Sequence, residues 1–293
     1  MKWLEMLKEG TSLRFDYLIN SRNEELLNED ERMVYNRKQQ LFEKRKAVIV
    51  KSNAEAVVTR QMNVSGRHIV HYQLQVEHLV KQQDFFYVEE GIEQRRAVFE
   101  KGKLLEDQLL VVKRPQSVEE ISSGNAEERV TYKYDRRAAV QYAEKWWNGR
   151  NPAYRTFDVD CTNFISQCLR AGGAPMTGYP NRGRGWWYSG NSWSYSWAVA
   201  HSLRWYLSGA KQGLQAKEMS SARDLVLGDV ICYDFEGDGK WDHNTIVVAK
   251  DANDEPLVNA HTNDSRMRYW KYEDSAAWTP NIKYKYFHIL SSE

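Results

Sequence analysis

The sequence predicts an α+β protein of two domains, on three observations. A helical pattern is followed over residues 47–113 by stretches in which apolar and polar residues alternate, as in antiparallel strands. Two helical patterns in residues 135–173 precede a second set of strand patterns. Composition also changes near residue 130, because residues 131–293 hold ten of the 11 Trp and 12 of the 17 Gly. We therefore predict an accessory domain over 1–118, a linker over 119–131 and a second domain over 132–293.

The overall composition excludes several classes of protein. With 42% apolar and 28% charged residues, the chain can bury a core and is not expected to be disordered. Its 41 basic and 40 acidic residues give no broad field that would attract nucleic acid or an anionic membrane. No transmembrane stretch and no secretory signal peptide is visible, and three cysteines make no disulfide scaffold. We expect a soluble cytoplasmic protein, with non-classical export to the cell wall as the alternative.

The first domain is expected to contain one or more helices and a curved antiparallel meander. Asn20 or Ser21 is predicted to cap a helical run that ends near Phe42. From Ala47 onward, alternating segments are separated by short turns that contain Ser-Gly, Gln-Asp and Lys-Gly. This order of elements is similar to nuclear-transport-factor and cystatin-like architectures. Because no catalytic pattern occurs here, we expect this domain to bind or position a partner that the sequence does not identify.

A cysteine opens the second helix of the second domain. Asp160 is predicted as its N-cap and Gly172-Gly173 as its stop, so that Cys161 lies in the first turn on the apolar face. The partial positive charge at a helix start stabilises a thiolate, and the Cys161 amide can help to bind an oxyanion. The alternative is that Cys161 is a small buried apolar residue, as expected for Cys168 and Cys232.

A histidine and an amide follow on predicted neighbouring strands. His243 opens one apolar strand, and Asn259 lies on the next strand, 16 positions later. Because antiparallel neighbours are about 5 Å apart, an amide oxygen on one strand can orient an imidazole on the other. Together with Cys161, these residues form a candidate nucleophile, base and orienter.

The ordered motifs of this half resemble the putative amidase domain family of Gram-positive bacteria, which is related to the papain-like NlpC/P60 and CHAP hydrolases. The motifs are Asp160 to Gln167, Ala171 to Gly173, Gly228 to Val230, Asp242-His243 and Ala260 to Thr262. The resemblance covers residues 134–288 and implies a papain-like domain in which N-terminal helices pack against an antiparallel sheet. It also implies that Cys161 is the nucleophile, His243 the general base and Asn259 the orienter, with His261 as the rival orienter.

The sequence also offers candidates for oxyanion and substrate contacts, of which the oxyanion candidate rests on the resemblance. The glutamine that papain-like enzymes often place before the cysteine is missing, and Tyr154 is its candidate substitute. Candidate substrate contacts are Asp160 and three tryptophans of the aromatic loop, Trp186, Trp187 and Trp193; a second packed core is the alternative for the tryptophans.

The expected activity is hydrolysis of an amide in a peptide or peptidoglycan-type substrate, without a metal or an organic cofactor. A catalytically weak binding module and an acyltransferase that uses the same residues are the alternatives. The acidic segment 234–242 is interpreted as a hairpin turn rather than a calcium loop, because the twelve-residue calcium pattern is incomplete.

Overall fold

The computed structural model describes residues 2–22, 27–110 and 131–292. The chain divides into two compact units, one of residues 1–112 with 271–277 and the other of residues 113–270 with 278–293. Residues 271–277, which were assigned to the second domain from the sequence, group with the first unit. The predicted linker, 119–131, lies outside the described residues except for Thr131.

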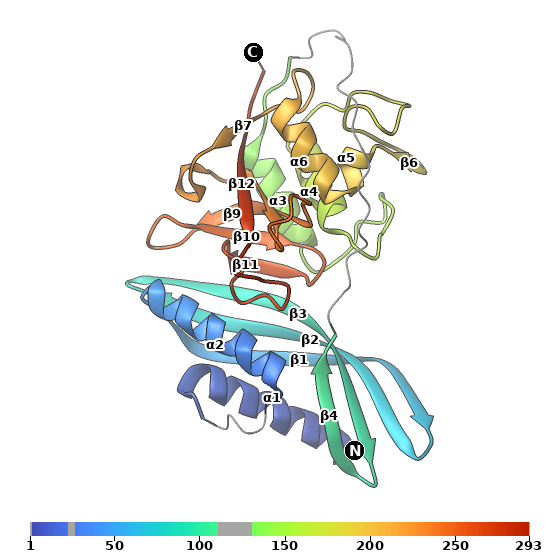
Figure 1. Ribbon diagram of the computed structural model, residues 1–293, viewed down its shortest axis with the longest axis vertical. Helices are drawn as coiled ribbons and strands as arrows, with labels where there is room; N and C mark the ends of the chain where they lie inside the picture. Colours follow the sequence, from blue (N-terminus) through green and yellow to red (C-terminus); the bar gives the residue numbers. More distant parts are fainter. Residues whose placement is uncertain (1, 23–26, 111–130, 293) are drawn as a thin grey trace. The chain divides into compact units, whose positions relative to one another are not determined.

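The first unit contains two helices and an antiparallel meander (Figure 1). Strand β2 pairs with β1 along its whole length and with β3 on its other side, and β3 also pairs with β4. The apolar faces of β2 and β3 pack on α1 in a cluster that includes Leu7, Tyr72 and Phe99. The elements are α1 (Lys2–Asn20), α2 (Glu29–Lys44), β1 (Ala47–Val64), β2 (Arg67–Gln82), β3 (Phe85–Glu100) and β4 (Lys103–Leu109).

The helical part of this unit differs from the prediction. The described residues contain two helices, within the expectation of one or more, but Asn20 ends the first helix rather than capping the second. The N-cap of α2 is Asn28, whose side-chain oxygen accepts a hydrogen bond from the Glu31 amide at 2.9 Å. Ser21 has a positive φ, whereas an N-cap residue typically has the extended conformation of the β region.

The second unit packs helices on an antiparallel sheet whose strand order is β11-β10-β9-β8-β12-β7 (Figure 1). The helices are α3 (Arg136–Trp146), α4 (Cys161–Ala171), α5 (Tyr195–Ala198) and α6 (Ala200–Gly209), followed by a short 3₁₀ turn at Ala222–Asp224. The strands are β7 (Ala216–Met219), β8 (Val230–Asp234), β9 (His243–Lys250), β10 (Pro256–Ala260), β11 (Ser265–Tyr269) and β12 (Lys283–Ile289), with a small hairpin of β5 (Tyr188–Ser189) and β6 (Ser192–Trp193).

One apolar core joins α4 to the sheet. Phe164, Ile165 and Leu169 of α4 are fully buried in the same cluster as Val230 of β8 and Ile246 of β9. Asp135 caps α3 as predicted, since its carboxylate accepts a hydrogen bond from the Ala138 amide at 3.0 Å. Among the described residues, no helix has the length and apolarity that a membrane crossing requires.

Candidate active site

Cys161 is the first residue of α4, and its side chain is 1% exposed. Asp160 precedes it in the N-cap position, but its carboxylate does not cap the helix amides as predicted. The carboxylate instead accepts hydrogen bonds from the Phe157 amide and from the Asn163 side chain. The amides of the first helical turn lack intrahelical acceptors by geometry, so this end of α4 retains donors suited to an oxyanion.

Asp160 is a structural residue of this site. Its second oxygen lies 2.7 Å from His261 Nδ1 and 3.3 Å from Arg150 Nε, and its amide donates to Thr262 Oγ1. The residue is 1% exposed, and these contacts account for its carboxylate within the fold. Its role as a substrate contact stays a prediction.

His261 is held on both ring nitrogens. Nδ1 faces Asp160, Nε2 lies 2.8 Å from the Trp146 carbonyl, and the ring stacks on Phe164 with 3.9 Å between centroids. These contacts fix the segment after β10 to the start of α4. To orient His243, His261 would need one of its ring nitrogens for that contact. Both nitrogens are engaged in the contacts described above.

His243 opens β9 and is fully buried. It lies opposite Tyr233 in the pairing of β8 with β9, and its ring is 5.6 Å from that of Tyr233 and 6.2 Å from that of Phe235, measured between centroids. Two aromatic rings thus restrict the imidazole by packing.

A buried hydrogen bond joins the two elements that carry Cys161 and His243. Thr162 Oγ1 donates to Asn244 Oδ1 at 2.9 Å, and Asn244 Nδ2 donates to Cys232 Sγ at 2.9 Å. Thr162 Oγ1 also lies 3.7 Å from the Cys161 sulfur. The first turn of α4 is therefore fixed to the start of β9, one residue from each member of the predicted pair. The sequence analysis missed Thr162 and Asn244, although Asn244 follows the histidine directly.

Asn259 is not brought to His243. It lies opposite Ile246 in the pairing of β10 with β9. Its amide donates to Glu144 at 2.8 Å and accepts from the Met267 backbone at 2.9 Å, so both of its polar atoms are engaged. Asn259 thus links β10 to α3 and to β11. Its contacts do not include the one to His243 that strand adjacency predicted.

The tryptophans of the aromatic loop divide into core and surface. Trp186 and Trp187 are 0% and 1% exposed, and their indole nitrogens donate to Ser166 and to the Asn181 carbonyl. Their burial favours the alternative of a packed core, and their role as substrate contacts stays a prediction. Trp193 remains partly exposed, with its ring 4.9 Å from that of Phe157 between centroids.

Tyr154 packs among aromatic rings. Its ring centroid lies 5.1 Å from that of Tyr188 and 5.9 Å from that of Trp197, and burial raises the pKa of its hydroxyl. These contacts account for the residue as packing, and its oxyanion role stays a prediction.

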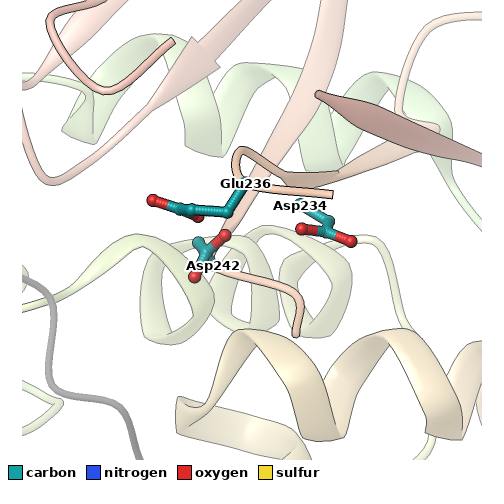
Figure 2. A group of neighbouring side chains, drawn as sticks. All are labelled: Asp234, Glu236 and Asp242. Carbon is teal, nitrogen blue, oxygen red and sulfur yellow. The ribbon is translucent and has the colours of Figure 1, made fainter. Parts of the chain in front are cut away.

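The acidic segment forms a turn, shown in Figure 2. Oxygens of Asp234, Glu236 and Asp242 lie within 4.8 Å of one another. Asp234 is fully buried and accepts hydrogen bonds from the amides of Gly237 and Gly239, while Asp242 accepts from the Phe235 amide. Backbone donors thus stabilise the carboxylates of Asp234 and Asp242, which supports the hairpin interpretation.

The other two cysteines provide a chemical contrast to Cys161. All three cysteines lie in the described part of the chain, and none forms a disulfide. Burial raises the pKa of the Cys168 thiol well above its ordinary value. Burial also raises the pKa of the Cys232 thiol, opposed in part by the hydrogen bond from Asn244 and the charge of Arg204. Neither is suited to form a thiolate at neutral pH.

Comparisons with known proteins show the family of this chain. The chain belongs to the family described as "Putative amidase domain", whose sequence profile matches residues 133–287. It is 53% identical over 268 residues to "Uncharacterized protein YhbB" of Bacillus subtilis (strain 168), an alignment that covers 88% of this chain and 86% of the relative. It is also 35% identical over 138 residues to "Uncharacterized protein YjcM" of the same organism, covering 44% of this chain and 31% of that relative. No solved structure matches the chain.

Proposed function

We propose that the second unit is a cysteine-dependent amide hydrolase of papain-like, NlpC/P60-related type. Cys161 is the nucleophile, His243 the general base, and the substrate is a peptide or a peptidoglycan-type amide. The observation that carries the proposal is the hydrogen bond between Thr162 and Asn244, because it fixes the helix start that bears Cys161 to the strand start that bears His243. Membership of the amidase domain family supports the class of reaction.

The chemistry follows from these positions. His243 takes the thiol proton, and the Cys161 sulfur attacks the amide carbonyl to give a tetrahedral oxyanion. Donors at the start of α4 stabilise that oxyanion. His243 then protonates the leaving amine, the C–N bond breaks, and a thioester remains. Water, deprotonated by His243, hydrolyses the thioester and restores the thiol.

The burial of both groups imposes a condition on this mechanism. Cys161 and His243 are 1% and 0% exposed, so a substrate reaches the sulfur only when neighbouring side chains move. Burial also excludes water from the charged intermediate, where hydrogen bonds to an oxyanion are worth more than in bulk solvent.

The test is the pH dependence of Cys161 alkylation by iodoacetamide, read by peptide mass spectrometry with Cys168 and Cys232 as internal controls. An ordinary thiol has a pKa of about 8.5. The proposal is supported if Cys161 still reacts well below that pH and if this reaction is lost in His243→Ala. Alkylation as slow as that of the two controls contradicts it and favours a binding module. Turnover that survives in Cys161→Ala excludes the mechanism outright.

A further inference from the structure

Arg204 of α6 is a buried cation whose packing partners are aromatic rings. The residue is 7% exposed, and its Nε and Nη1 atoms are buried without a hydrogen-bond partner. Within residues 2–22, 27–110 and 131–292, no carboxylate forms an ion pair with it. The ring centroid of Trp205 lies 3.8 Å from its guanidinium carbon, and that of Trp241 lies 5.1 Å away.

The other unit of the same chain shows how a buried arginine is ordinarily accommodated. Arg95 is 1% exposed, and its guanidinium pairs with Glu31, Glu93 and Asp107. Arg14 likewise pairs with Asp107 at 2.8 Å. Because removing a charge from water costs several kcal/mol unless it is paired, the solitary position of Arg204 is energetically unfavourable for folding alone.

The stacking geometry defines the kind of ligand that would complete the site. A guanidinium that stacks on an indole keeps its N–H groups directed outward in its own plane. Such a planar edge matches a carboxylate, which accepts two parallel hydrogen bonds. Burial lowers the pKa of Arg204 and the charge of Glu218 opposes this shift, but the ion pair that the Glu218 carboxylate forms is with Lys285.

Arg204 belongs to the same region as the proposed catalytic pair. Trp241, against which it packs, precedes His243 by two residues. Burial raises the pKa of Cys232, the Arg204 charge lowers it and the Cys161 charge raises it, so both charges act on one sulfur atom. That sulfur accepts a hydrogen bond from Asn244, which is bonded to Thr162 beside Cys161.

We infer that Arg204 anchors a carboxylate of the substrate, so that the amide attacked by Cys161 lies in an acidic peptide. The assignment of the anion as substrate rests on the proposed function, whereas the anion site itself does not. The site consists of the Arg204 guanidinium and the rings of Trp205 and Trp241 that pack against it.

The first experiment compares two alkylating reagents of similar size on the full chain. In both, the Cys161 thiolate displaces iodide and an S–C bond forms, but iodoacetate carries a carboxylate and iodoacetamide does not. We expect the iodoacetate-to-iodoacetamide rate ratio at Cys161 to exceed that of N-acetylcysteine and to fall about fivefold or more in Arg204→Gln, as expected for loss of one nearby charge. The matched control is Arg137→Gln, which removes an exposed arginine of α3 and should leave the ratio unchanged. A ratio that is the same in Arg204→Gln as in the unmodified chain overturns the inference.

A second measurement separates the inference from the proposed function. In Cys161→Ala with ¹⁵N-labelled tryptophan, acetate should cause a saturable shift of the Trp205 indole resonance that acetamide at equal ionic strength does not cause. The shift should disappear in the Cys161→Ala, Arg204→Gln double variant. If Cys161 is inert to both reagents while acetate still binds, the hydrolase proposal fails and the anion site stands. If acetate causes no saturable shift, the anion site is refuted whatever the reactivity of Cys161.

Discussion

Replacement of Thr162 by valine tests the contact on which the proposed function depends. Valine has nearly the same shape as threonine but cannot donate a hydrogen bond. The substitution leaves Asn244 Oδ1 without its 2.9 Å donor in a side chain that is 0% exposed. A buried acceptor that loses its donor costs about 1–3 kcal/mol, and we expect the free energy of unfolding of the second unit to fall by that amount.

The loss should also reach the nucleophile. If about 1.4 kcal/mol of the interaction holds the start of α4 in its reactive position, the rate of Cys161 alkylation should fall roughly tenfold. Unfolding in urea can be followed by tryptophan fluorescence, because ten of the 11 tryptophans lie in residues 131–293. Alkylation is measured on the same samples by mass spectrometry. Thr162→Ser, which keeps the donor, is the matched control for the alkylation rate.

Two results would refute this reasoning. A free energy of unfolding within about 0.5 kcal/mol of the original value would mean that the hydrogen bond contributes nothing net. An unchanged alkylation rate in a destabilised Thr162→Val protein would separate the structural bond from the chemistry. A double-mutant cycle with Asn244→Leu isolates the pair, since its coupling energy should be about 1 kcal/mol if the two side chains act together.

Three further predictions address other parts of the chain. Burial lowers the pKa of His78 well below its ordinary value, so the unfolded chain binds a proton at this residue more readily than the folded chain. The free energy of unfolding, measured in urea, should therefore fall as the pH drops below about 6.5, by about 1 kcal/mol at pH 5.5. This loss should be absent in His78→Gln. Arg95→Met should destabilise the first unit by about 3–5 kcal/mol in calorimetry, because it leaves buried carboxylates unpaired, and a change under 1 kcal/mol would contradict this. Asn259→Ala should lower the melting temperature and change the alkylation rate of Cys161 little. A loss of reactivity without a loss of melting temperature would restore Asn259 as the orienter.

The elements that carry the site could be predicted because each has a local signal. The apolar spacing from Cys161 to Leu169 is helical, and a glycine pair follows, so the start and end of α4 were predictable from neighbouring residues. The strand that begins at His243 was predictable from its apolar run after an acidic turn. In contrast, α1 was missed because its apolar positions are irregularly spaced along Lys2–Asn20.

What the sequence did not predict depends on contacts between distant segments. Adjacent strands suggested that Asn259 faces His243, but the pairing of β10 with β9 places Asn259 opposite Ile246, three residues farther along β9 than His243. Asp160 meets His261 across 101 residues of sequence, a contact that no local pattern encodes. Aromatic composition likewise does not distinguish a cleft from a core, and only the fold places Trp186 inside.

The region around Cys161 departs from the rule that governs the rest of the core. Where α4 and α6 face the sheet, most positions are apolar, as a core selected for stability requires. Asn244 and His243 are nevertheless 0% exposed, and Arg204 is 7% exposed. An apolar residue in place of Arg204, which has no hydrogen-bonded or ionic partner for its buried nitrogens, would fold more stably. Arg204→Met should therefore raise the melting temperature of the second unit while abolishing the preference of Cys161 for iodoacetate, and a fall in melting temperature would instead assign Arg204 to structure.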